Sequence, residues 1–388
     1  MKSLNAFFSP FLSFTLICTV LIISGCAPKA KVPITTLDTP EHHVLIGMKF
    51  LQIGKIKDAE REFKLAQELD NNYSPAYRGL GIISAYKGDF NAAFKNMSQA
   101  KLLAKSKKDD ALTYVGFMRL YTLQKDENWL ENVKENFHKA RSIDKDLLDA
   151  HFYMGVAYKE AYKLEDAAVA FKKVLEINRA FLDQADDQLE LIRKIDKAMP
   201  ETLIGKRIAL LEKVKKVDVA ALFIHELKLA NLYEKLKPKQ SETSSKSMDK
   251  SPSIQEVPIP IDVQDHPLRA DIQAIIKLGV KGLSVLPDGS FAPNVFITRA
   301  SYAEMIVDII KTITNDSSLE DKYKGVASPF IDVRNDASYF NAIMVCTKRG
   351  IIEPKSDIGQ SFFAPMGSIS GVDALLAIRK LKEDLKLF

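Results

Sequence analysis

The sequence lacks the short motifs that most enzyme chemistry requires. It contains no His-Glu-x-x-His metal motif, no nucleophile elbow and no phosphate-cradling glycine loop. Its six histidines are scattered, and the adjacent pair His42 and His43 has no evident partner cluster. Its carboxylates stand beside lysines on predicted helix faces, as on ordinary surfaces. We therefore expect no catalytic residue, no metal site and no cofactor.

A strong charge of one sign is also missing. The 388 residues include 55 Lys and Arg against 50 Asp and Glu, a formal net charge of +5. The lysines alternate with acids along predicted helices, which indicates solvated faces rather than a basic patch. We expect no nucleic-acid partner.

The first residues predict an exported protein. Lys2 precedes an apolar run from Leu4 to Ile23, as in a secretory signal peptide over residues 1–25. A membrane helix is the alternative, because about 20 apolar residues could span a bilayer. The run ends in Ile-Ser-Gly-Cys at Cys26, which resembles the bacterial lipobox. The resemblance implies an acylated Cys26, a tether over residues 26–40 and, because Ala27 follows, transfer to the outer membrane. We expect the anchored protein to face the periplasm.

Cysteine is scarce, with three in the chain. Cys18 leaves with the signal peptide and Cys26 takes the lipid, so no intramolecular disulfide can form. The remaining Cys346 follows Ala342 and Ile343 at helical spacing. We expect a small buried core residue there rather than a nucleophile.

A repeat with a period near 34 residues runs from about residue 41 to 178. Its four copies share small and aromatic positions: Gly47, Ala59, Phe63, Ala66; Gly81, Ala93, Met97, Ala100; Gly116, Val133, Phe137, Ala140; and Gly155, Ala167, Phe171, Val174. Segments 58–69 and 165–177 place apolar residues at helical spacing. A lone helix pair cannot bury its apolar face, so the pairs should stack into a solenoid.

These positions resemble the tetratricopeptide repeat, in which small residues let antiparallel helices approach and an aromatic fills the gap between pairs. The resemblance implies an array over residues 41–200, capped or extended by helical residues 181–199, with a concave surface that binds a peptide or a partner protein. By repeat phase we place six residues there, ordinary core being the alternative at each: Met48, Leu51, Arg78, Ile82, Phe117 and Phe152. A C-terminal carboxylate ligand is not indicated, because no ring of Lys and Asn occurs in that phase.

Residues 237–258 are rich in Ser, Lys and Pro and predict a flexible linker. Residues 259–388 then hold two copies of another pattern, which opens with Asp-Val at Asp262 and Asp332. Between its two helices comes a turn, Pro-Asp-Gly at Asp288 and Gly289 in the first copy. Thr298 is suited to cap the second helix, and an Arg beside a helix start makes an anion-binding corner.

This pattern looks like the S-layer homology motif, which binds cell-wall polysaccharide, either a pyruvylated polymer or peptidoglycan-linked material. Carried over by position, Thr298 and Arg299 bind the ligand, while Asp288 and Gly289 shape the adjacent loop. The pattern is incomplete, because the family's Trp is absent from both first helices and Ser301 replaces its usual Glu. A degenerate structural role is the alternative.

A third copy of the second helix lies before the linker. Residues 214–222 align with 297–305 and with 369–377, and place Lys216 and Gly371 at the position of Arg299. Since the family folds three motifs into one pseudo-threefold unit, residues 201–236 would supply a third lobe without a recognisable first half. A further repeat-type helix is the competing interpretation.

The sequence thus predicts an all-α protein, a tetratricopeptide-type solenoid followed by a mainly helical S-layer-homology-like domain. We expect an outer-membrane lipoprotein that binds wall polymer and an unknown protein partner. The rival is an assembly or secretion scaffold whose second module contacts only protein. A peptidoglycan-modifying enzyme would need a catalytic cluster that the sequence does not contain.

Overall fold

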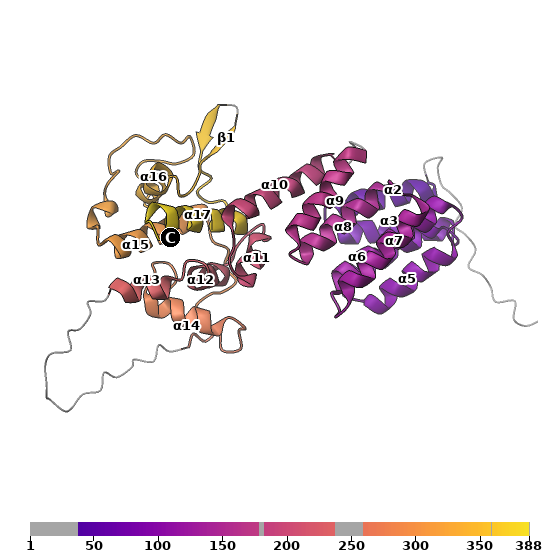
Figure 1. Cartoon of the computed structure of the whole chain (residues 1–388), viewed down its shortest axis with the longest axis horizontal. Coiled ribbons are helices and arrows are strands. Elements are labelled where there is room, and N and C mark those ends of the chain that lie inside the picture. Colours follow the sequence, from indigo (N-terminus) through magenta and orange to yellow (C-terminus); the bar gives the residue numbers. More distant parts are fainter. Residues whose placement is uncertain (1–37, 178–181, 237–258, 358, 388) are drawn as a thin grey trace, which may run out of the picture. The chain divides into compact units, whose positions relative to one another are not determined.

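The computed structural model describes residues 38–177, 182–236, 259–357 and 359–387. In these residues regular structure is almost entirely α-helix, so the predicted all-α class is confirmed. The predicted signal peptide, Cys26, most of the predicted tether and the predicted linker at 237–258 lie outside them. No helix in the described part of the chain is both long and apolar enough to cross a membrane. The chain divides after Leu182 into two compact units, here unit 1 and unit 2 (Figure 1).

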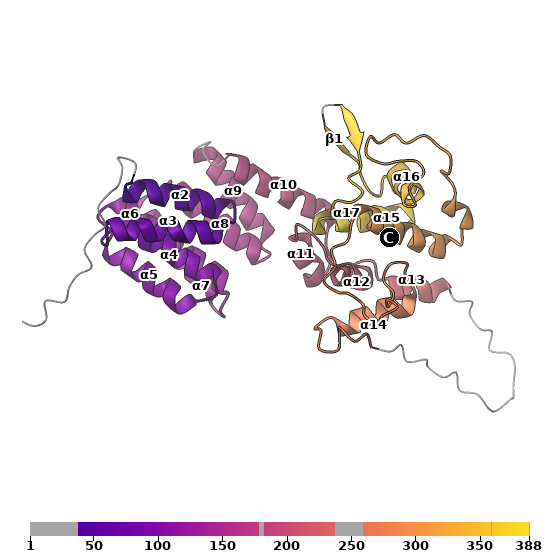
Figure 2. The ribbon, with the colours of Figure 1, turned by 180° about the vertical axis from the view of Figure 1, so that it is seen from behind.

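Unit 1 is a stack of four helix hairpins (Figure 2). The hairpins are α2 (Pro40–Gln52) with α3 (Ile56–Leu69), α4 (Ser74–Tyr86) with α5 (Phe90–Leu102), α6 (Lys107–Gln124) with α7 (Trp129–Ile143), and α8 (Leu148–Glu160) with α9 (Leu164–Ile177). The first helices of successive hairpins, α2, α4, α6 and α8, also pack on one another. They therefore form a continuous layer along the stack.

Small residues set the distance between helices in unit 1. A Cβ added to Gly47 would lie 2.8 Å from the Phe63 ring, and one added to Gly79 in the next hairpin would lie 2.4 Å from it. Phe63 is completely buried between these two glycines. Met97 takes the same place one hairpin later, 2.4 Å from a Cβ at Gly116. Gly47 and Gly116, two of the repeated glycines, thus leave the space that a large side chain of α3 or α5 fills.

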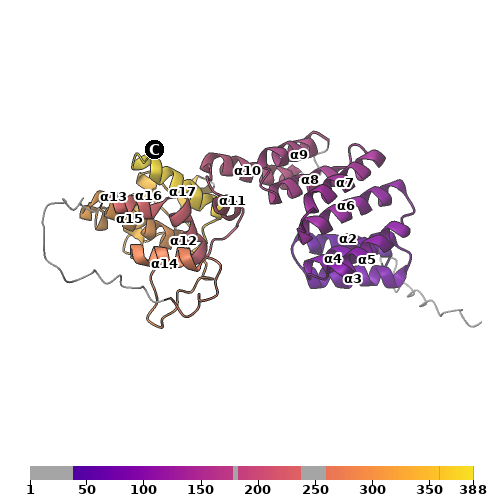
Figure 3. The same cartoon turned by 60° about the horizontal axis from the view of Figure 1, so that its bottom comes forward.

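Unit 2 contains the remaining helices and one short antiparallel strand pair (Figure 3). Its elements are α10 (Leu182–Ala198), α11 (Leu203–Ala209), α12 (Lys216–His225), α13 (Leu229–Leu236), α14 (Arg269–Leu278), α15 (Arg299–Thr314), the 3-10 helix η2 (Ser317–Glu320), α16 (Phe340–Lys348), β1 (Lys355–Asp357), β2 (Gln360–Phe362) and α17 (Gly371–Asp384). Apart from its first residue, α10 belongs to this unit, which begins at Asp183. The sequence analysis had assigned that helix to the repeat array.

Three extended segments close a ring at the centre of unit 2. The Val214 N–H donates to Ile369 O, the Ile369 N–H to Ile297 O and the Ile297 N–H to Val214 O, each at 3.0 Å. Each segment leads into a helix, namely α12, α15 and α17. These are the three segments that align in the sequence, and the ring relates them by a pseudo-threefold axis. We call the parts built on α12, α15 and α17 lobes 1, 2 and 3.

The opening aspartates of lobes 2 and 3 each hold a loop. Both carboxylates accept two backbone N–H groups: Asp262 those of Phe291 (2.8 Å) and Ala292 (2.7 Å), and Asp332 those of Phe363 (2.9 Å) and Ala364 (2.7 Å). The two alanines have positive φ angles of 57° and 55°. Charge-assisted bonds of this kind are stronger than neutral ones, which explains how a left-handed alanine is stabilised in each loop.

Candidate functional site

Thr298 and Arg299 begin α15, as the sequence predicted. The Thr298 hydroxyl accepts a hydrogen bond from the Ser301 N–H at 3.1 Å, so the predicted cap is confirmed. Arg299 is buried and donates from Nε to Phe363 O (2.8 Å) and from Nη2 to Glu353 O (2.7 Å). Its guanidinium also lies 4.7 Å from the centre of the Phe363 ring. Two of its nitrogens therefore bind backbone carbonyls of lobe 3, while the side chain also lines a pocket described below, so its role in ligand binding stays a prediction.

The equivalent positions in the other lobes make the same type of contact. Lys216 in lobe 1 is buried, donates to Ser284 O at 3.1 Å and lies 4.2 Å from the Phe291 ring of lobe 2. Burial lowers the pKa of Lys216 and that of Arg299. Gly371 in lobe 3 has no side chain, and a Cβ there would lie 1.7 Å from Ile208 O. All three positions therefore join one lobe to the next.

Asp288 and Gly289 form the predicted turn but do not lie with Arg299. The Asp288 carboxylate accepts from Ser290 N (2.9 Å) and Ser290 Oγ (2.7 Å), and these bonds lower its pKa. Gly289 has a φ of 84°, which favours glycine, and its carbonyl accepts from Ile261 N at 3.2 Å. The turn belongs to the segment of lobe 2 whose Ser284 and Phe291 contact Lys216. Both residues shape a loop, as expected. This loop lies at the contact between lobes 1 and 2, whereas Arg299 lies at the contact between lobes 2 and 3.

Two pockets open at equivalent places in unit 2. One, of 270 Å³, is bordered by α15 and α16, and the other, of 490 Å³, by α10 and α17. The first is lined by Glu304, Val307, Asp308 and Lys311 of α15, and the second by Leu376, Arg379, Lys380 and Glu383 of α17. When Ile297 is aligned with Ile369 in the sequence, each of the four α15 residues aligns with one of the four α17 residues. Helix α10 therefore borders the pocket beside α17, as α16 borders the pocket beside α15.

The third equivalent place carries a direct contact between its two helices. His225 of α12 and Asp271 of α14 lie 2.9 Å apart, Nε2 to Oδ1. His225 aligns with Asp308, one of the residues that line the α15–α16 pocket. A hydrogen-bonding contact between His225 and Asp271 thus joins the helices of lobes 1 and 2 where the other two places hold pockets.

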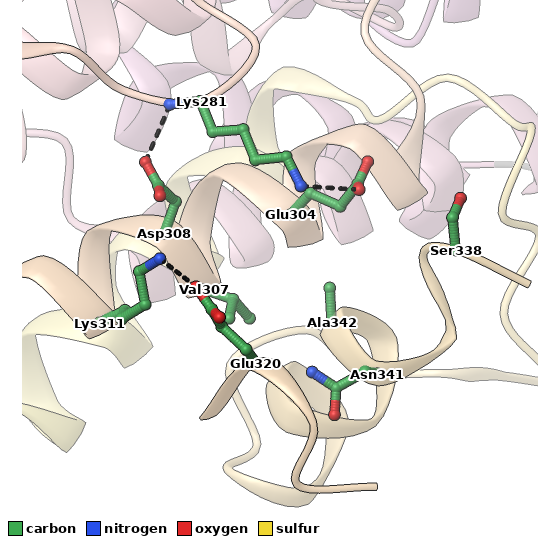
Figure 4. Close-up of a pocket in the computed structure, with 9 residues that line it drawn as sticks. All are labelled: Lys281, Glu304, Val307, Asp308, Lys311, Glu320, Ser338, Asn341 and Ala342. Atoms are coloured by element: carbon green, nitrogen blue, oxygen red, sulfur yellow. Dashed lines mark hydrogen bonds and ion pairs between the residues drawn. The ribbon is translucent and has the colours of Figure 1, made fainter. Parts of the chain in front are cut away.

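The charged side chains that line the α15–α16 pocket pair with one another (Figure 4). Lys281 lies 3.4 Å from Glu304, and its backbone N–H donates to Asp308 at 2.9 Å. Lys311 pairs with Glu320 at 2.5 Å, and this bond raises the pKa of Lys311. Two lysines thus face three carboxylates in the lining. The pocket offers no surplus cation to an anionic ligand.

The α10–α17 pocket has the opposite balance. Five cationic side chains line it with three carboxylates: Lys194, Lys197, Arg299, Arg379 and Lys380 against Glu353, Asp373 and Glu383. Lys194 also pairs at 2.8 Å with Glu190, which lies outside the lining, so one positive charge remains in excess. A low-dielectric wall of Ile351, Ile352 and Leu376 borders the charges and strengthens their field. This pocket is the candidate functional site. Of the ligand residues predicted from the sequence, Arg299 lines this pocket. Lys194 and Lys197 were missed because α10 was counted with the array, although the two lysines share one helix face.

The six residues expected on the concave surface of unit 1 differ in how deeply they are buried and in what they contact. Leu51 and Ile82 are core residues, 8% and 2% exposed, so the alternative interpretation applies to them. Met48 and Phe117 are partly buried against the same core cluster. The Phe152 ring lies 5.6 Å from that of Phe171. Arg78 is half-buried on α4, and its surroundings are described below.

Cys346 is the buried core residue that the sequence predicted. Its thiol lies 3.6 Å from Ala303 O, and burial raises its pKa, which keeps it protonated. Within residues 38–177 and the described parts of unit 2, no three His, Cys, Asp or Glu side chains come together to hold a metal ion. Comparison of the sequence with protein-family models and with curated proteins finds no match.

Proposed function

We propose that the protein is an envelope lipoprotein, anchored in the outer membrane by acylated Cys26, whose unit 2 binds an anionic cell-wall polymer. In this proposal unit 1 is a tetratricopeptide-type array that recruits a protein, and unit 2 is a three-lobed S-layer-homology-like domain. The protein would then tether or scaffold the envelope between membrane and wall.

The observation that carries the proposal is the surplus of positive charge in the α10–α17 pocket. A carboxylate or pyruvyl group on a sugar polymer needs cationic donors beside an apolar wall, and this pocket provides both. The closed ring of Val214, Ile297 and Ile369 supports the three-lobed interpretation. The glycines that receive Phe63 support the repeat interpretation of unit 1.

One observation favours the rival function, a scaffold whose unit 2 binds only protein. Large apolar side chains are exposed on this unit, including Ile261 (66%), Ile331 (68%) and Met366 (64%). Arg299, the ligand residue that the family resemblance implies, donates two hydrogen bonds to backbone carbonyls. If unit 2 binds no wall material, these apolar side chains become the first place to seek a protein contact.

The test is co-sedimentation of residues 27–388, without lipid, with purified sacculi before and after wall-linked polymers are removed. We expect the double variant Lys194→Gln and Lys197→Gln to weaken binding about tenfold, equivalent to about 1.4 kcal/mol. Lys281→Gln with Lys311→Gln, in the other pocket, removes the same charge and should leave binding unchanged. Equal losses in both variants would contradict the assignment of the pocket, and absence of binding by the unaltered chain would contradict wall binding itself.

A further inference from the structure

Arg78 is a half-buried cation on the face where α4, α6 and α8 lie side by side. Its aliphatic stem lies against Gly116 of α6, 3.4 Å from where a Cβ of that glycine would be. Its only hydrogen bond is a long one, 3.5 Å from Nη1 to the backbone carbonyl of Asp109. Burial lowers its pKa. A guanidinium normally satisfies several donors when it is desolvated, so this one lacks a strong acceptor.

A second guanidinium lies on the same face. Arg119 of α6 lies 4.4 Å from the centre of the Tyr153 ring on α8, a cation–π contact that leaves its hydrogen-bond donors available. It lies close enough to Arg78 for the two charges to interact. The two arginines thus extend across three consecutive hairpins.

The carboxylates nearby do not form ion pairs with these arginines. Asp149 of α8 feels both guanidinium charges and that of Lys108, yet no ion pair within 4.0 Å joins it to any of them, and burial raises its pKa. The Asp109 carboxylate instead accepts from the Ser106 hydroxyl at 2.7 Å, at the start of α6. In the described part of unit 1, neither Arg78 nor Arg119 therefore has a carboxylate within ion-pair distance.

We infer that the partner of unit 1 presents an extended segment whose Asp or Glu side chain binds between Arg78 and Arg119. A carboxylate there would supply the acceptor that both guanidiniums lack, and the rings of Phe152 and Tyr153 would border the segment on α8. The inference rests on the proposed recruitment of a protein by unit 1. It is independent of the wall pocket of unit 2.

The experiment is fluorescence anisotropy with residues 27–388 and a labelled twelve-residue peptide of alternating Glu and Ser, compared with its Gln and Ser twin. We expect the acidic peptide to bind at least fivefold more tightly and to weaken with salt. Arg78→Gln with Arg119→Gln should abolish the difference, and Arg119→Gln alone should reduce it. Asp149→Asn should tighten binding of the acidic peptide, because the competing carboxylate is removed.

The matched control is Lys95→Gln with Lys172→Gln, which removes two exposed cations from α5 and α9. It should bind both peptides like the unaltered chain. Equal binding of the two peptides, loss of binding in the control as well, or no binding by either peptide would overturn the inference. If both peptides bind equally and Phe152→Ala weakens both, unit 1 still recruits peptides and only the acidic preference fails.

Discussion

At the scale of single residues, the side chain that a position can accommodate depends on the space that the neighbouring lobe leaves. The equivalent positions 216, 299 and 371 carry Lys, Arg and Gly, yet all three face the carbonyl groups of another lobe. Long cations reach those carbonyls where there is space, and glycine stands where the backbone itself is in contact. An alignment of the three segments shows which residues correspond, but it cannot show this difference in available space.

Gly371→Ala should therefore destabilise unit 2 strongly. The added methyl would overlap Ile208 O and disturb the bond from the Gly371 N–H to Leu211 O. Overpacking of a tight contact costs about 1–3 kcal/mol, and we expect the upper end in a chemical denaturation curve. Gly367→Ala, whose Cβ would lie 3.2 Å from Ala364 O, should cost much less. A similar loss in both variants would show that the contact at Ile208 is not specific.

Local chemistry was predictable at this scale, and long-range chemistry was not. The Thr298 cap depends on residues 298 to 301 alone, so the sequence indicates it directly. The fate of the Arg299 side chain depends on carbonyls at residues 353 and 363. Nothing adjacent to Arg299 in the chain reveals those acceptors, so the sequence could not show that two of its donors bind backbone carbonyls.

At the scale of elements, helical periodicity predicted where helices form better than what they pack against. The predicted segments 58–69 and 165–177 match α3 and α9 to within two residues. Residues 182–198 of the predicted stretch 181–199 form α10, but an amphipathic pattern does not say which unit covers the apolar face. The strands β1 and β2, three residues each, were not predicted because runs so short carry no period.

Glu201 links three elements of unit 2, and its effect on stability should depend on pH. Hydrogen bonds from Lys228 (2.7 Å) and Lys382 (2.9 Å) lower its pKa from 4.5 to about 2. A depressed folded-state pKa stabilises the fold above pH 4.5, and this contribution is lost as the pH falls toward 2. Because the side chain is 43% exposed, solvent screening limits the effect to roughly 1 kcal/mol or less.

Glu201→Gln should thus lower the free energy of unfolding at pH 7 by that amount and make no difference near pH 2. Urea denaturation of both proteins across this pH range measures the change. Glu212→Gln, which alters an exposed carboxylate of the same unit, should be neutral throughout. A difference that persists unchanged at pH 2 would assign the effect of Glu201 to packing rather than to charge.

At the scale of the whole molecule, the division into two units predicts two unfolding events. Phe63→Ala should remove about 3–5 kcal/mol from unit 1, because the ring fills the space between two glycines. Gly371→Ala should act on unit 2 alone. In scanning calorimetry each variant should lower one transition and leave the other in place. A single transition that shifts in both variants would mean that the units unfold as one.

The ring of Val214, Ile297 and Ile369 has a mechanical consequence if the protein tethers membrane to wall as proposed. It joins a segment near the beginning of unit 2 to one near its end by a backbone hydrogen bond, and the Lys382–Glu201 pair adds a second link between the same regions. A pull that enters unit 2 from unit 1 would therefore reach α17 directly, without travelling the intervening length of chain. Tension would load these few bonds together, and their joint rupture would set the force at which unit 2 opens.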